Sequence, residues 1–152
     1  ESAGMSFPRR DGRVWVTEKD GIAAVLLMME VMAKTGKDIG TLYQDLVKKY
    51  GPHQYERIDM PASMEKKKRL ADLTSNPQEV KNLLNGKKIA GRAIERLVIG
   101  DGLKVVLEGG VWVLKRASGT ENIIKDYREE RGDSLSTVRK ASAEIDAYLG
   151  LA

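Results

Sequence analysis

The sequence predicts an α+β fold over residues 52–152, in which helices pack on an antiparallel sheet, preceded by a helical segment over residues 1–51. Two observations support this prediction. Four strand-like runs follow one another in the second part, and a C-terminal stretch carries one apolar stripe at helical spacing. The first part has two helical patterns and no comparable series of strands, so the two parts differ in class.

The composition is that of a soluble globular protein, with 41% hydrophobic and 32% charged residues among 152. The net charge of +4 is compatible with nucleic acid, a membrane surface or an anionic small molecule. Because basic and acidic residues are interleaved, a phosphorylated metabolite is a sufficient partner. The absence of cysteine excludes disulfides, thiolate catalysis and zinc-thiolate sites, and favours a reducing, cytoplasmic location. We find no signal peptide, and the longest apolar run, residues 22–29, is too short to span a membrane.

Residues 1–19 read as loops with one short strand at 14–16. Asp20 is a suitable N-cap for a helix over residues 21–34, whose side chains are apolar nearly all round. We therefore expect most of this helix to be buried. Its methionines are interpreted as core filling, because no cysteine or histidine accompanies them.

A second helix is expected to start at Asp38 or Thr41 and to end before the Gly-Pro pair at 51–52, a strong breaker. The pattern changes there to an extended run over residues 53–60. We therefore place a domain boundary at this pair. His53 is expected to be a surface or strand residue and not a catalytic base, because no partner lies near it in the sequence.

The second part continues with a lysine-rich helical pattern over residues 64–73 and another over residues 76–84. Four strand-like runs follow, over residues 93–99, 103–107, 111–114 and 123–127. Glycine-rich turns join the first three runs, which implies an antiparallel sheet. A final helix, capped by Asp133 or Ser134 and ending at Leu149, should lie on this sheet through its apolar stripe.

Residues 116–122, Arg-Ala-Ser-Gly-Thr-Glu-Asn, form a polar loop between two of the expected strands. Its chemistry suits a phosphate. Arg116 offers a forked, permanently charged donor, Ser118 and Thr120 offer hydroxyl groups, and Gly119 lets backbone N–H groups approach an anion. Taken alone, the segment could equally be an ordinary polar hairpin connection.

The pattern Arg-x-Ser-Gly-Thr-Glu between two strands resembles the phosphate-binding loop of the α-D-phosphohexomutases. In that family the loop lies in the fourth and last domain and holds the phosphate of the sugar that is not reacting. Here Asn122 replaces the usual proline, and Lys125 stands where many members have arginine. The resemblance implies the following substrate-phosphate ligands: Arg116, Ser118, Gly119, Thr120 and Lys125.

Two further motifs resemble the same family. The opening Glu-Ser-Ala-Gly is similar to the tail of the sugar-selecting loop of the third domain, which implies that Glu1 and Ser2 bind sugar. Residues 18–21, Glu-Lys-Asp-Gly, resemble a stretch whose lysine reaches the active site, and Lys19 is the matching residue. Together with Arg-Asp-Gly at 10–12, the wording is most similar to bacterial α-D-glucose-type phosphoglucomutases.

The resemblance implies a fold, a reaction and cofactors. Residues 1–51 would be the helical end of the α/β third domain, and residues 52–152 the TATA-binding-protein-like fourth domain. The enzyme would interconvert glucose 1-phosphate and glucose 6-phosphate through a phosphoserine, with Mg²⁺ as cofactor and glucose 1,6-bisphosphate as intermediate. The motifs for the phosphoserine and the metal do not occur in this sequence, so no metal ligand is expected here. We expect a C-terminal piece that is inactive without the N-terminal domains.

Three other functions stay open at this point. The chain could belong to a phosphomannomutase or another phosphohexomutase. It could be a non-catalytic nucleic-acid-binding module that uses the basic cluster at residues 66–69, although a solvated helix face explains that cluster better. It could also be a structural regulatory domain. We favour a phosphorylated hexose as the partner, with no nucleic acid and no membrane.

Overall fold

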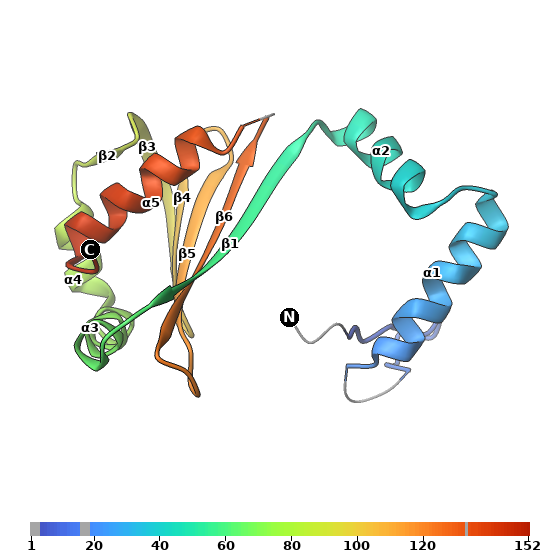
Figure 1. Ribbon diagram of the computed structural model, residues 1–152, viewed down its shortest axis with the longest axis horizontal. Coiled ribbons are helices and arrows are strands. Elements are labelled where there is room, and N and C mark those ends of the chain that lie inside the picture. The colour runs from blue at the N-terminus through green and yellow to red at the C-terminus, as the bar shows by residue number, and fades with distance from the viewer. Residues whose placement is uncertain (1–3, 16–18, 133) are drawn as a thin grey trace. The chain divides into compact units, whose positions relative to one another are not determined.

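The computed structural model describes residues 4–15, 19–132 and 134–152. The chain divides into two compact units, residues 1–50 and 51–152 (Figure 1). The first unit is helical, and the second contains the sheet. The expected fold class, helices packed on an antiparallel sheet after a helical segment, is confirmed.

The first unit contains α1 (Gly21–Thr35) and α2 (Ile39–Tyr50). The Asp20 carboxylate accepts a 3.0 Å hydrogen bond from the Ala23 amide, as expected of an N-cap. The Asp38 carboxylate accepts one of 2.8 Å from the Thr41 amide, so Asp38, not Thr41, starts the second helix. The short strand expected at 14–16 is reduced among the described residues to a single bridge between Pro8 and Val14, and Val16 lies outside them.

The expectation that α1 is mostly buried is wrong for this structure. None of its residues is buried, and Ile22 and Leu26 expose 76% and 59% of their surface. The physical reason is that, within the described part of the first unit, α2 and a short preceding segment cover only part of the apolar surface of α1. The methionines of α1 are therefore not core filling here, since Met28 and Met29 are exposed as well.

The second unit contains a six-stranded sheet in the order β1-β6-β5-β4-β3-β2, with every neighbouring pair antiparallel. The strands are β1 (His53–Pro61), β2 (Lys88–Ile89), β3 (Arg92–Ile99), β4 (Leu103–Leu107), β5 (Val111–Ala117) and β6 (Ile123–Arg131). The helices are α3 (Met64–Ser75), α4 (Pro77–Leu84) and α5 (Ser136–Leu149). The sequence did not predict β2, which is two residues long.

The three helices lie on one face of the sheet (Figure 1). Burial alternates strictly along β4 and at the start of β5, so Val105 and Val113 point into the core and Trp112 points to the other face. We call the face under the helices the inner face and the opposite one the outer face. The core joins inner-face residues to the apolar stripes of the helices, such as Leu70, Val80 and Ile145.

The start of α5 differs from the expected cap. Asp133 lies outside the described residues, and the N-cap is Leu135, which makes no side-chain cap hydrogen bond. The free amide at Val138 is satisfied from another element, because the Glu130 carboxylate of β6 accepts a 2.9 Å hydrogen bond from it. Ser134 accepts a hydrogen bond of 3.0 Å from the Ser136 amide and so organises the turn before the helix.

Candidate functional site

The loop between β5 and β6 is held together by its own hydrogen bonds. The Ser118 amide donates to the carbonyl of Ile123 at 3.0 Å, which closes the loop. The Glu121 amide donates to the Ser118 hydroxyl at 3.2 Å, and that hydroxyl lies 3.4 Å from the Glu121 carboxylate. Ser118 is buried and therefore organises the loop from inside.

Gly119 and Thr120 form the exposed tip of this loop. A Cβ atom built at Gly119 meets no protein atom within 4 Å. Glycine is therefore not required here by neighbouring protein atoms, and the space beside its backbone is open to a ligand. Thr120 is the next residue in the sequence, and it is also solvent-exposed.

Arg116 and Lys125 stand directly opposite each other on neighbouring strands, β5 and β6. Both belong to the outer face, because their inner-face neighbours Lys115 and Asp126 are fully buried. Like charges directly opposite each other in a sheet repel. Acidic neighbours offset part of this repulsion, and an anion that lies between the two cations would offset it further.

An acidic side chain borders this pair at each side. The Arg116 guanidinium lies 2.7 Å from the carboxylate of Asp101, in the turn between β3 and β4. Asp59 is the β1 residue paired with Lys125. A hydrogen bond from Arg57 lowers the pKa of the Asp59 carboxyl, and the charges of Arg57 and Lys125 lower it further. The site therefore has a positive centre with acidic edges.

The turn that carries Asp101 is placed by a close approach of two backbones. A Cβ atom at Gly102 would lie 2.7 Å from the Lys115 carbonyl oxygen, which no other residue type could tolerate without movement. This contact holds the turn against β5 at the position of Arg116. A side chain at residue 102 would therefore require this turn or β5 to move.

Helix α3 supports the loop from a different element. The Lys67 ammonium donates a 2.7 Å hydrogen bond to the carbonyl of Glu121. The backbone amide of Ala62, just before α3, donates to the carbonyl of Asn122 at 2.9 Å. The basic cluster at residues 66–69 is thus partly engaged within the fold, since Arg69 also binds Glu79 at 2.6 Å.

A buried network of charges lies directly behind the cation pair. The Lys115 ammonium donates to Asp126 and Asp146 at 2.8 Å each and to the Ser142 hydroxyl at 2.7 Å. Asp126 also accepts hydrogen bonds from Arg128, one of them at 2.8 Å. Burial raises the pKa of the Asp146 carboxyl, and the charge of Lys115 opposes that shift.

Lys19 lies in the first unit, immediately before the N-cap of α1, and is exposed. Gly4 lies against it, because a Cβ atom at Gly4 would approach the Lys19 Cβ to 2.9 Å. Backbone hydrogen bonds between Met5 and Asp20 fix this contact. The structure thus brings the end of the opening motif next to Lys19. Glu1 and Ser2, the expected sugar ligands, lie outside the described residues.

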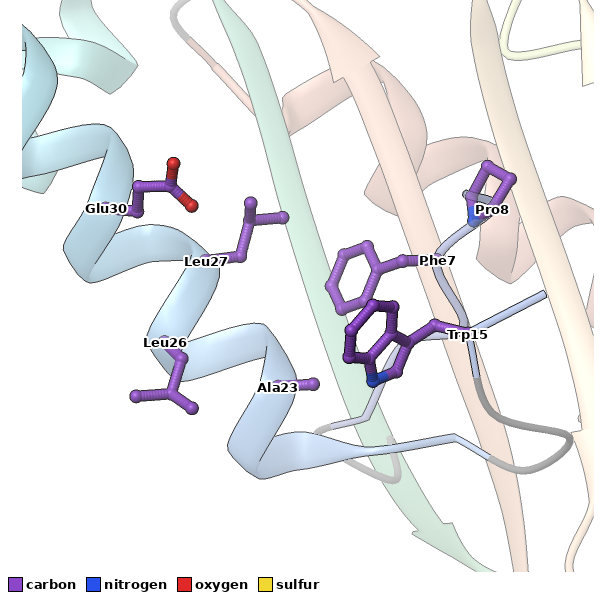
Figure 2. A pocket seen from close by; sticks show the side chains of 7 residues that line it. All are labelled: Phe7, Pro8, Trp15, Ala23, Leu26, Leu27 and Glu30. Carbon is purple, nitrogen blue, oxygen red and sulfur yellow. The ribbon is translucent and has the colours of Figure 1, made fainter. Parts of the chain in front are cut away.

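An apolar groove of about 510 Å³ lies beside this segment. Figure 2 shows Phe7 and Trp15 pointing toward α1, where Leu27 and Ala23 form the opposite wall. The Arg9 guanidinium lies 5.0 Å from the centre of the Trp15 ring, in the range of a cation–π contact. The groove contains one acidic side chain, Glu30, which pairs with Lys34 at 2.5 Å.

Several site residues were not predicted from the sequence. Asp101 and Lys67 approach the loop from other segments of the chain, and Lys115 lies on β5 itself with its side chain buried on the inner face. One signal was available for Lys115: it follows an apolar run at the inward-facing spacing of a strand. The contact with Lys67 depends on tertiary packing, which the sequence pattern does not reveal.

Comparison with known proteins identifies the class. The family model for "Phosphoglucomutase/phosphomannomutase, alpha/beta/alpha domain III" matches residues 1–50. Residues 1–50 are therefore similar to domain III of this family, and the predicted resemblance to the phosphohexomutases is confirmed.

Individual relatives agree with this class. The chain is 42% identical over 134 residues to a phosphoglucomutase of Komagataeibacter xylinus. The matched region covers 85% of this chain and 23% of that protein. It is 30% identical over 133 residues to a phosphoglucomutase/phosphomannomutase of Thermococcus kodakarensis, covering 88% of the chain and 24% of the relative. The chain thus spans about a quarter of the length of the curated relatives it matches.

A solved structure shows the same fold. It is the open form of pp63/parafusin, a phosphoglucomutase from Paramecium, with a TM-score of 0.58 and 19% sequence identity. The match covers 90% of this chain and 28% of that one, and so includes residues from both units.

Residues 4–15, 19–132 and 134–152 contain no group of three or more histidine, aspartate or glutamate side chains that could hold a metal ion. None of the helices within these ranges has the length and apolar character needed to cross a membrane.

Proposed function

We propose that this chain is the substrate-phosphate-binding, C-terminal portion of a phosphoglucomutase, which interconverts glucose 1-phosphate and glucose 6-phosphate. The observation that carries the proposal is the facing pair of cations, Arg116 and Lys125, beside an exposed loop tip with open space at Gly119. Two opposed cations favour a divalent anion between them, and a sugar phosphate is such an anion. The relatives' names supply the reaction class.

The loop would hold the phosphate that does not react. Phosphoryl transfer depends mainly on positioning and on charge stabilisation, so a firm grip on the distant phosphate contributes directly to rate. Arg116 would supply a bidentate contact, Lys125 a second charge, and the backbone at Gly119 together with the Thr120 hydroxyl further donors. Ser118, which is buried, would keep the loop in the binding shape.

The proposal extends to the first unit. Lys19 would act near the phosphoryl group that is transferred between the enzyme's phosphoserine and the sugar, with glucose 1,6-bisphosphate as intermediate. Support comes from its exposure and from its contact with Gly4, which follows the expected sugar ligands Glu1 and Ser2 in the sequence. The enzyme would be cytoplasmic, in keeping with a sequence that contains no cysteine.

The residues present do not fit a magnesium site. Mg²⁺ prefers clustered oxygen ligands, and the described part of the chain offers no group of three acidic or histidine side chains. Under the proposal, the ion and the phosphoserine would be held by N-terminal domains of the same enzyme.

A coupled assay tests the proposed function. The complete enzyme should convert glucose 1-phosphate with a higher kcat/KM than mannose 1-phosphate, while the 152-residue chain alone should show no turnover above a buffer blank. A complete enzyme that strongly prefers mannose 1-phosphate would favour the phosphomannomutase alternative. Turnover by the chain alone would contradict its role as a binding portion.

A further inference from the structure

The apolar residues of β5 and β6 do not by themselves specify the register in which the two strands pair. At the start of β5, Val111–Leu114 is apolar on both faces, and β6 begins with two isoleucines, Ile123 and Ile124, one on each face. Register is specified weakly where both faces of a strand have similar character. The five-residue connection 118–122 is also longer than the tight turns that fix register by themselves.

Lys115 and Asp126 remove this ambiguity. They are directly opposite each other, both are fully buried, and the Lys115 ammonium lies 2.8 Å from the Asp126 carboxylate. A shift by one residue would turn Lys115 to the outer face and would bring either Leu114 or Arg116, in place of Lys115, opposite the buried Asp126. A shift by two would place Lys115 opposite either Arg128, a like charge, or Ile124, an apolar side chain.

Helix α5 strengthens this selection. Ser142 and Asp146, one helical turn apart, accept the two remaining hydrogen bonds of the Lys115 ammonium at 2.7 Å and 2.8 Å. The ammonium thus has all three donors satisfied in one register only. Buried ionic groups contribute little net stability, and their best-attested use is to specify one arrangement among competing ones.

We propose that Lys115 and Asp126 are positioning residues for the phosphate site, because their buried pairing sets the register that places Arg116 opposite Lys125 on the outer face. Each cation is the immediate chain neighbour of one partner of the buried pair. A shift by two residues would oppose Arg116 to Tyr127 or Ile123 and separate it from Lys125. The proposal rests on the proposed function only where it concerns phosphate affinity.

The experiment compares Lys115→Met and Asp126→Asn with Val113→Ala in the 152-residue chain. Val113 is the preceding inner-face residue of β5 and is fully buried, so its truncation loosens the core without affecting the ion pair. Two readouts are recorded: interstrand backbone NOEs between Arg116 and Lys125, and affinity for glucose 6-phosphate and inorganic phosphate by NMR titration. We expect both ion-pair variants to lose these NOEs and to bind at least fivefold more weakly, and Val113→Ala to keep the NOEs and an affinity within twofold of the wild type.

Native NOEs and native affinity in a folded Lys115→Met or Asp126→Asn variant would overturn the proposal, and so would an equal loss of affinity in Val113→Ala. If both ion-pair variants fail to fold while Val113→Ala folds, the pair is a general stability element and the positioning role is rejected. If the wild-type loop binds neither ligand, the proposed function fails, and the NOE comparison still determines whether the pair sets the register.

Discussion

Arg116 of β5 and Asp101 of the β3–β4 turn form an ion pair, with guanidinium and carboxylate 2.7 Å apart, at the edge of the proposed phosphate site. A phosphate bound to Arg116 would compete with this carboxylate and would be repelled by it. Both side chains are more than one third exposed, at 43% and 81%, so the pair itself adds little stability.

Asp101→Ala should therefore raise the affinity for phosphate, by roughly two- to fivefold at low salt, with less effect at high salt. Isothermal titration calorimetry with glucose 6-phosphate measures this affinity. Glu108→Ala is the matched control, because it removes one exposed carboxylate from the turn at the opposite end of β4. A weaker affinity in Asp101→Ala alone would mean that the carboxylate orients Arg116 for binding.

Lys67→Ala should weaken phosphate binding through the loop. The variant loses the hydrogen bond to the Glu121 carbonyl, which is worth about 1 kcal/mol. If phosphate binding must then order the loop, the affinity for phosphate should fall roughly fivefold. Lys68→Ala makes the same charge change at an exposed neighbour and should leave the affinity nearly unchanged. Equal losses in both variants would instead indicate that only the net charge of α3 matters.

Glu56 should make the stability of the second unit depend on pH. Hydrogen bonding from Arg139, followed by the charges of Arg139 and Arg128, lowers the pKa of the Glu56 carboxyl. A lowered pKa in the folded state means that the stabilisation is fully present above about pH 4.3, the ordinary value for glutamate, and is lost as the pH falls through the folded-state pKa.

Glu56→Gln should remove this acid-dependent loss and cost about 1–2 kcal/mol of unfolding free energy at neutral pH, because charge-assisted hydrogen bonds are lost. Urea unfolding at a series of pH values gives both quantities. Glu95→Gln, at an exposed position on β3, is the control and should leave the wild-type pH profile intact. Parallel profiles for the wild type and Glu56→Gln would contradict the prediction.

Lys19→Ala should slow the reaction of the complete enzyme more than it weakens substrate binding. If Lys19 acts near the transferring phosphoryl group, kcat should fall at least tenfold, equivalent to roughly 1.4 kcal/mol of transition-state stabilisation, while KM changes less. Lys48→Ala removes an exposed lysine of α2 and serves as the control. A kcat within error of the wild type would identify Lys19 as an ordinary surface lysine.

The sequence predicted most elements of the second unit because local patterns determine them. A strand-like run marked β4, and glycine-rich turns marked its two ends. The two-residue strand β2 has no pattern of its own, since it forms only by pairing with β3. The cap of α5 could not be predicted for a similar reason: Glu130 supplies it from the end of β6.

The candidate site divides in the same way. The loop at residues 116–122 was visible because its chemistry is contiguous in the sequence. The partners Asp101 and Lys67 are brought to it by sheet topology and helix packing, which no local pattern records. The exposed apolar side chains of α1 went against the prediction, because periodicity indicates which side chains prefer burial but not what covers them.

The most direct test of the central claim is an NMR titration of the 152-residue chain with glucose 6-phosphate. We predict that the backbone amide signals of Ser118, Gly119 and Thr120 are the first to shift in the wild type. The same signals should shift more weakly in Arg116→Lys. Arg116→Ala should bind at least tenfold more weakly, because a charge-assisted bidentate contact is worth roughly 1.5–3 kcal/mol. Shifts confined to residues 66–69 with an unchanged loop, or equal affinities for wild type and Arg116→Ala, would contradict the assignment of this loop as the phosphate site.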